Sequence, residues 1–226
     1  MSVTDTSHAI PQQSHGSAIV IIGVLFFIFG FVTWLNGPLI TFVKLAFGLD
    51  DVNAFLVPMA FYLSYFFLAL PASFILKLTG MKKGMAVGLV VMAIGAVLFG
   101  QYTTMRVYPG SLTGLFVIGA GLALLQTASN PYVSILGPIE SAAQRIAVMG
   151  ICNKGAGILA PIVIGAVVLH GLDDFDRQIK AAPSPSAREA LLDLFAARVH
   201  LPYLVMAAVL VILAFGIVMS SLPEIR

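Results

Sequence analysis

Six long apolar stretches restrict the fold of this chain more than any other feature of its sequence. Each contains roughly the 20 mostly apolar residues that a transmembrane helix requires. They cover about residues 18–43, 55–76, 85–104, 112–136, 146–169 and 201–222. Five contain no Asp, Glu, Lys or Arg, and the fifth contains only Lys154. We therefore predict an all-α polytopic membrane protein with six transmembrane helices between residues 18 and 222.

The composition supports this prediction and argues against other classes. Charged residues make up 10% of the chain, whereas a soluble domain carries about 25%, and the mean hydropathy is +1.01. The net charge of +2 gives no reason to expect a nucleic-acid partner. The only cysteine, Cys152, excludes a disulfide within the chain.

The basic residues predict an orientation for the chain. If the loops that carry them face the cytoplasm, the positive-inside rule is obeyed, and the residues concerned are Lys77, Lys82, Lys83 and Arg145. We then expect both termini in the cytoplasm, with residues 1–17 as a polar leader and 223–226 opening a cytoplasmic loop. The predicted location is the plasma (inner) membrane, where the chain crosses the lipid bilayer several times.

One connection, residues 171–200, is long and is expected to lie outside the cytoplasm. It carries four basic residues but also five acids, so it weighs less in the orientation than the lysine cluster does. Its stretch 186–199 opens with an N-cap, Ser186, and alternates Leu, Phe and Ala with charges. This pattern predicts a short amphipathic surface helix, for which a solvated loop helix without direct function is the plain interpretation.

Polar side chains inside the six stretches are the candidate functional residues, because a polar group in hydrocarbon is costly unless it meets a partner or a cavity. Gln126 and Asn130 are four residues apart and share one helix face. The alternative is that these amides only bond neighbouring helices together. The predicted substrate-binding residues are Asn36, Gln126, Asn130, Asn153 and Lys154.

Lys154 is the hardest of these residues to explain as a contact between helices. It lies about eight residues into its stretch, or about 12 Å at 1.5 Å per residue, and a central Lys costs about 2.5–3.5 kcal/mol to insert. None of the six stretches contains a carboxylate to pair with it. We therefore expect Lys154 to face a cavity, a carbonyl cluster, a substrate or an acid on another polypeptide.

The first and fourth stretches share a short pattern. FIFG at residues 27–30 precedes Asn36-Gly37-Pro38, and FVIG at residues 116–119 precedes Asn130-Pro131. Paired interruptions in corresponding helices point to the binding site of a transporter built from repeats. The pattern therefore predicts two repeats of three helices each.

Four motifs resemble those of the fucose–galactose–glucose symporters of the major facilitator superfamily, especially the glucose/galactose transporter branch. The resemblance covers essentially the whole chain after the leader. The motifs are FFIFGF at 26–31 leading to Leu35-Asn36, KLTGMKKG at 77–84, QTASNPYV at 126–133 closing in Leu136-Gly137-Pro138, and ESAAQR at 140–145 running on to Asn153.

The resemblance implies a fold of twelve helices in two six-helix halves, with a sugar site between them near mid-membrane. This chain corresponds to the first half, so we expect a truncated or split half-transporter that requires a C-terminal half. A homodimer of halves is the less favoured alternative. The implied function is transport of a neutral hexose by alternating access, in which Gln126 and Asn153 bond sugar hydroxyls while Asn36 and Asn130 shape the cavity.

Two departures from the family pattern bear on ion coupling. Fucose-type members place one carboxylate beside the helix-one Asn and another in helix four, and the matching positions here are Gly37 and Gln126. Lys77 stands where the wider superfamily commonly has Asp. These departures argue against proton coupling through this half, in which Lys154 is the one candidate proton carrier. Our hypothesis is that a complete protein built on this half is sodium-coupled or passive, with Lys154 held as a fixed charge.

Two other functional classes are weaker alternatives. A six-helix membrane scaffold without transport activity would be favoured if the polar residues lined no common cavity. A membrane enzyme requires a nucleophile and base, or metal ligands, yet His170 and His200 show no recognised ligand spacing with Asp173 and Asp174. We expect no enzyme activity, no metal and no cofactor.

Overall fold

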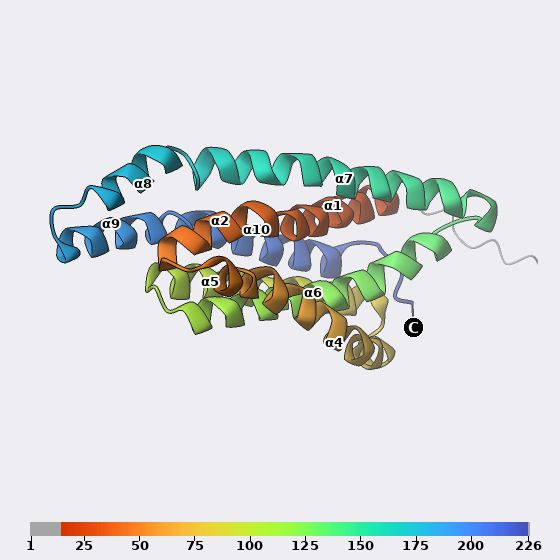
Figure 1. Cartoon of the computed structure of the whole chain (residues 1–226). Coiled ribbons are helices and arrows are strands. Elements are labelled where there is room, and N and C mark those ends of the chain that lie inside the picture. The colour runs from red at the N-terminus through yellow and green to blue at the C-terminus, as the bar shows by residue number, and fades with distance from the viewer. Residues whose placement is uncertain (1–14, 226) are drawn as a thin grey trace, which may run out of the picture.

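The computed structural model describes residues 15–225, which form a bundle of six membrane-spanning rods (Figure 1). Each rod is long and apolar enough to cross a bilayer, so the predicted all-α fold with six spans is confirmed. The predicted leader lies mostly outside the described residues. The rods are, in order, α1 His15–Trp34 with α2 Asn36–Phe47, α3 Asp51–Ala54 with α4 Leu56–Thr79, α5 Met81–Thr104, α6 Tyr108–Ile135, the 3-10 turn Ile139–Ser141 with α7 Ala142–Val167, and α10 His200–Met219.

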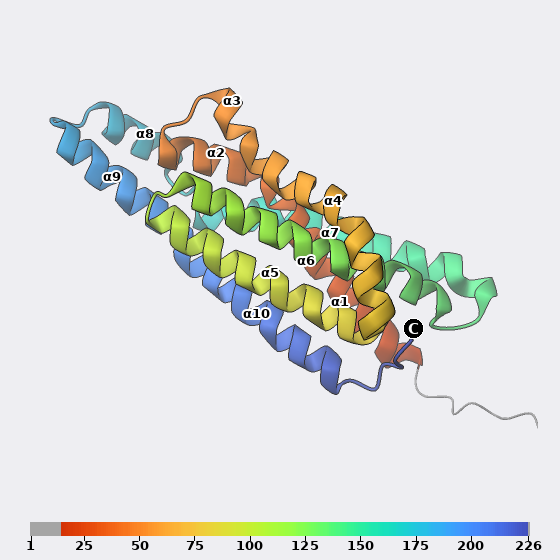
Figure 2. The same ribbon diagram turned by 90° about the horizontal axis from the view of Figure 1, so that it is seen from below.

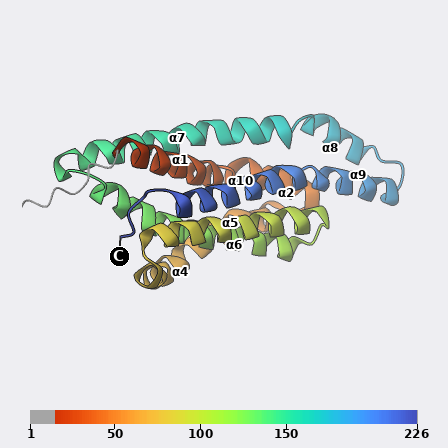
Figure 3. The same ribbon diagram turned by 180° about the vertical axis from the view of Figure 1, so that it is seen from behind.

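The rods lie in three layers that are visible from two opposite sides (Figures 1 and 3). One outer layer is α7 alone, the middle layer contains α1, α2 and α10, and the other outer layer contains α4, α5 and α6. Seen from below, α5 runs between α6 and α10 (Figure 2). The described start of α1 and the segment after α10 lie at the same end of the bundle, as an even number of spans requires.

Prolines explain why two of the rods are divided. Pro38 and Pro58 follow the divisions at Leu35 and Phe55 by three residues. A proline has no N–H to donate to the carbonyl four residues earlier, so the carbonyls of Trp34 and Ala54 lose their helical partners. The helical path continues through both points, since the N–H of Leu35 donates to the Phe31 carbonyl and the N–H of Phe55 to the Asp51 carbonyl, each at 3.1 Å.

The most extensive contact in the bundle joins α5 and α6, and it includes two pairs of glycines. A Cβ atom on Gly88 would lie 2.8 Å from the Gly121 carbonyl oxygen, and one on Gly95 would lie 2.8 Å from that of Gly114. Such distances leave no room for a side chain, so the two backbones approach directly. Small residues have this role in membranes because packing, rather than hydrophobic burial, drives helix association.

The repeat predicted from the sequence has a counterpart in the contacts between rods. Gly30 of α1 packs against Asn153 of α7, and Gly119 of α6 packs against Phe61 of α4. The first contact joins rods one and five, and the second joins rods four and two. In a protein with two three-helix repeats, rod one corresponds to rod four and rod two to rod five, so the two contacts are equivalent. Matching glycines of the two FxxG patterns therefore hold matching pairs of rods together.

The long connection contains two helices instead of the single one predicted. The expected surface helix is α9, Pro185–Ala197, and its N-cap is Ser184 rather than Ser186: the Ser184 hydroxyl accepts from the Ala187 N–H at 3.2 Å. Helix α8, Leu172–Lys180, was not predicted, although its acids come first and its bases last, as the helix dipole favours. The rings of Phe175 in α8 and Phe195 in α9 stack 4.8 Å apart.

At the opposite end, Arg145 closes the connection between α6 and α7. Its buried guanidinium donates to the carbonyl oxygens of Val133, Ser134, Gly137 and Pro138 and to the Ser141 hydroxyl, at 2.7–3.3 Å. The last carbonyls of a helix have no partner within it, and this one side chain satisfies several of them. Arg145 of the ESAAQR motif is therefore occupied in holding the end of α6.

The segment after α10 is fixed to the same end of the bundle. The Met81 N–H donates to the Ile225 carbonyl at 2.8 Å, the Lys82 N–H to the Glu224 carboxylate at 3.1 Å, and the Tyr132 hydroxyl to the Pro223 carbonyl at 2.8 Å. Gly80, whose φ is +81°, lets Glu224 approach, because a Cβ there would collide with its carboxylate. The KLTGMKKG motif thus binds the segment that follows the sixth rod.

Candidate substrate-binding groove

A groove of about 370 Å³ lies between α1, α4, α6 and α7, and most of the predicted site residues line it. Its wall contains both aromatic rings and polar side chains. The aromatic residues are Phe26, Phe29, Trp34 and Tyr62, and the polar residues are Thr33, Gln126, Asn130, Asn153 and Lys154. Four of the five predicted residues therefore converge on one cavity, and their mixture with aromatic rings is typical of a small-molecule site.

Asn153 is placed in the groove by the contact between α1 and α7. A Cβ on Gly30 would lie 2.6 Å from the Asn153 carbonyl oxygen, so only glycine permits the approach. The Asn153 amide then donates to the Phe26 carbonyl at 3.4 Å. This arrangement explains the glycine of the FFIFGF motif: it brings an amide of the fifth rod against the first.

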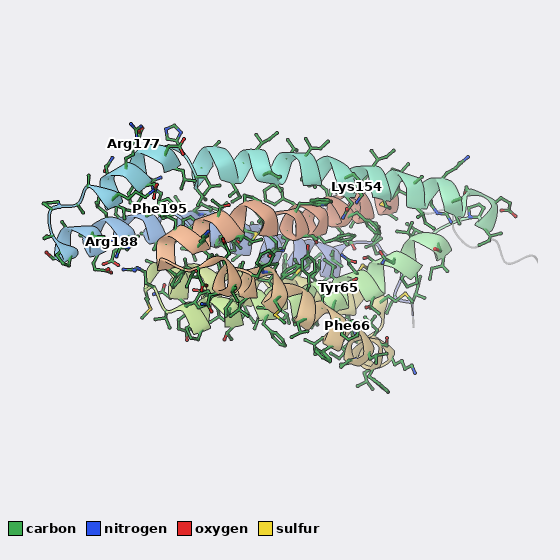
Figure 4. The ribbon with its side chains drawn as sticks, in the orientation of Figure 1. Tyr65, Phe66, Lys154, Arg177, Arg188 and Phe195 are labelled. Atoms are coloured by element: carbon green, nitrogen blue, oxygen red, sulfur yellow. The ribbon has the colours of Figure 1, made fainter. Side chains whose placement is uncertain are left out.

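Gln126 is oriented by a tyrosine of the neighbouring helix α4. The Tyr65 hydroxyl of α4 donates to Gln126 Oε1 at 2.9 Å, which leaves the amide NH₂ of Gln126 available to a ligand. Figure 4 shows Tyr65 and Lys154 at nearly the same position along the bundle, on α4 and α7. Asn130, one turn further along α6, is exposed at the same groove.

The structure places Lys154 well inside the fifth rod. It lies eight residues after Ile146, where the apolar part of α7 begins, or about 12 Å, and 13 residues before Val167 at the end of α7, or about 20 Å. The ammonium lies over the Trp34 ring, 5.1 Å from its centre, and no residue in the described part of the chain forms an ion pair with it. A cation–π contact at an exposed site contributes about 0.5–1 kcal/mol, less than the insertion cost of a central Lys.

Asn36 does not line the groove, which corrects the expectation that it would meet the other polar residues. It is buried at the start of α2, and its amide donates to the Thr33 carbonyl at 3.0 Å. Its Oδ1 atom has no partner within the described chain and adjoins a cavity of about 10 Å³. Such a volume holds about one water molecule, so the cavity is too small for a sugar.

Sequence reasoning missed Trp34, Tyr62 and Tyr65, because aromatic residues in an apolar stretch look like lipid-facing or core residues. One signal was available for Trp34. It is the only tryptophan of the chain and lies in the middle of its apolar stretch, whereas membrane tryptophans concentrate at the two interfaces.

The geometry bears on the scaffold alternative, which would be favoured if the polar residues lined no common cavity. Four of the five predicted residues line one. Across residues 15–225, no group of three or more His, Cys, Asp or Glu side chains is arranged to hold a metal ion. The groove lining includes amides, hydroxyls and one ammonium, which are groups that bind a polyhydroxylated ligand.

The six long apolar helices match one half of the major facilitator fold. The chain superposes on about half of the crystal structure of the outward-facing major facilitator transporter FucP, with a TM-score of 0.79 and 30% identity, covering 94% of this chain and 51% of that one. The structure of a variant of the Escherichia coli fucose:proton symporter gives a TM-score of 0.76 at 28% identity. No protein-family model matches the chain.

Comparison with curated proteins identifies the family. The chain is 35% identical over 223 residues to a glucose/galactose transporter of Brucella abortus, covering 99% of this chain and 50% of the relative. It is 31% identical over 202 residues to the L-fucose-proton symporter of Escherichia coli, covering 46% of it. The chain is thus a homologue of the major facilitator transporters of the fucose–galactose–glucose family, not an enzyme. It spans about half the length of the curated relatives it matches, corresponding to their N-terminal half.

Proposed function

We propose that this chain forms one wall of a transport site for a neutral hexose and works by alternating access. The observation that carries the proposal is the groove in which Gln126, Asn130, Asn153 and Lys154 meet. Gln126 and Asn153 are each anchored by one hydrogen bond and retain polar atoms for sugar hydroxyls. Asn130 shapes the open side of the groove. Asn36 supports the site from behind, by bonding the turn that precedes it.

The second wall of the site is a C-terminal six-helix half. The rods containing α4 and α7 flank the groove and are the least buried of the six, with 17% of each apolar window buried. Relatives twice as long as this chain transport glucose, galactose or fucose, according to their names. A site at the interface of two halves needs both of them for alternating access, so the chain alone binds sugar without accumulating it.

We place the protein in the inner membrane with both termini in the cytoplasm. The basic residues behind this orientation, Lys77, Lys82, Lys83 and Arg145, belong to two connections at the same end of the bundle. The segment after α10 binds one of these connections. The connection with α8 and α9 then lies on the outer side.

Coupling follows from the charges that the groove lacks. Gly37 and Gln126 occupy the positions of the two family carboxylates and cannot titrate, and no acid lines the groove in the part of the chain that the structure describes. A proton-coupled site needs a group that gains and loses a proton as the cavity changes sides. We propose sodium-coupled or passive transport, with Lys154 as a fixed charge.

The experiment joins this chain to the C-terminal half of the Brucella glucose/galactose transporter and measures uptake of labelled hexoses in proteoliposomes. The expected result is uptake by the joined protein, none by this chain alone, and loss of uptake on Gln126→Leu. Accumulation by the chain alone would contradict the half-site and indicate a homodimer. Absence of both uptake and sugar binding in a folded joined protein would overturn the proposal.

The same preparation tests coupling. Uptake should not respond to an imposed proton gradient, and Gln126→Glu should introduce that response, because it restores a titratable group in helix four. If a proton gradient drives uptake by the parent protein, and Lys154→Met abolishes that drive, Lys154 carries the proton and the coupling hypothesis is wrong.

A further inference from the structure

Trp34 occupies an unusual place for a membrane tryptophan. Its span runs from Gly16 to Phe47, so it lies about 27 Å from one end and about 20 Å from the other. Tryptophans that anchor a protein in a bilayer sit at the interfaces, which excludes that role here. The ring instead lines the groove, and the residue is 44% exposed.

Two residues of α7 hold the ring in this position. Gly157 lies directly against it, because a Cβ there would be 2.8 Å from both Cδ1 and Nε1 of the indole. Lys154, one turn earlier, places its ammonium over the ring. The ring thus packs directly against the backbone at Gly157, and the Lys154 ammonium covers one face.

The cover is movable. Lys154 is exposed, has a flexible four-carbon stem, and forms no ion pair with any residue from 15 to 225. The amides of Gln126 and Asn153 line the same groove as the ring. A pyranose needs both kinds of surface, since its hydroxyl edge bonds to amides while its C–H face lies against the electron-rich face of an aromatic ring.

We propose that Trp34 is the surface on which the pyranose ring of the substrate lies. The sugar takes the place of the Lys154 ammonium over the indole, and the ammonium turns to donate to the sugar hydroxyls. This inference rests on the proposed function and narrows it to hexoses in the ring form that present an unsubstituted C–H face.

The single tryptophan of the chain makes the contact directly measurable. The purified 226-residue chain in nanodiscs is titrated with glucose, galactose and fucose while Trp34 emission is recorded, and thermal stabilisation of the same samples reports binding independently. Binding sugars should change the emission saturably, whereas the open-chain alcohols glucitol and galactitol should not. Trp34→Ala should weaken binding about tenfold, the effect of losing an aromatic contact.

A matched pair of glycine variants separates the ring contact from general damage. Gly157→Ala displaces the indole from its packing position, so it should change both the emission without sugar and the affinity for sugar. Gly155→Ala, on the same helix, places its Cβ in open space and should change neither. Lys154→Met should alter the emission before any sugar is added, because it uncovers the ring. It should also remove the part of the sugar-induced change that arises when the sugar displaces the ammonium from the ring.

The outcomes distinguish this inference from the function on which it rests. If thermal stabilisation shows sugar binding while the emission stays constant, and Trp34→Ala binds with unchanged affinity, the stacking contact is wrong and the hexose site stands. If no sugar stabilises the chain or its joined form, the proposed function fails and the contact fails with it.

Discussion

Glycines have opposite effects at the α5–α6 contact and at the groove between α1, α4, α6 and α7. In the first, glycines on both helices face each other and the backbones meet, so most of both helices is buried. In the second, Gly30 brings in Asn153 and Gly157 seats Trp34, while α7 remains mostly exposed. Glycine closes one interface completely and, in the other, opens room for a side chain that faces a cavity.

The largest expected effect is in the closed interface. Gly95→Leu should prevent α5 and α6 from meeting, because a Cβ at this position already lies 2.6 Å from the Ile118 backbone nitrogen. Over-packing on this scale costs about 3 kcal/mol, measured as thermal unfolding in detergent. Gly216→Leu, on α10 with open space around it, is the matched control and should unfold like the parent. Equal stability of the two variants would show that the glycine contact does not hold the fold.

Next in size is the buried guanidinium that closes the α6–α7 connection. Arg145→Ala should destabilise the chain by about 2 kcal/mol, because several carbonyls lose charged hydrogen-bond partners together. Arg177→Ala removes an exposed arginine whose partner is three residues away and should change stability by less than about 0.5 kcal/mol. If the two variants unfold alike, the carbonyls at the end of α6 find other partners.

Removing the charge of the groove should raise the stability of the chain, whereas the two preceding substitutions lower it. Lys154→Met deletes a mid-membrane ammonium that has no ion pair among residues 15–225, so it should raise stability by about 1 kcal/mol while weakening hexose binding. Such opposed effects on stability and binding are expected where a functional residue destabilises the folded protein. Lys77→Met, at the end of α4, is the control for loss of a lysine. Loss of stability on Lys154→Met would mean that the ammonium supports the fold.

The smallest effect concerns the hydrogen bond that orients Gln126. Tyr65→Phe should weaken hexose binding about threefold, within the range of one neutral hydrogen bond, and leave thermal stability nearly unchanged. Tyr102→Phe, on α5 outside the groove, is the control. Unchanged affinity in the Tyr65 variant would show that Gln126 orients itself or does not contact the sugar.

The sequence by itself determined the number and type of spans, because a bilayer accepts only helices as long as these apolar stretches. It also indicated the polar groove residues, since the cost of a polar group in hydrocarbon singles out Gln126, Asn130, Asn153 and Lys154 wherever they point. The comparison with relatives then extended over 99% of the chain.

Only the tertiary structure decided which polar residues meet. Asn36 looked equivalent to the others in sequence, but it is buried at the start of α2 and lines a cavity of about 10 Å³ instead of the groove. Trp34 and Tyr65 entered the site because packing at Gly157 and the approach of α4 to α6 place them there. Helical periodicity specifies the face of a residue on its own helix, whereas the neighbour of that face depends on contacts between helices far apart in the chain.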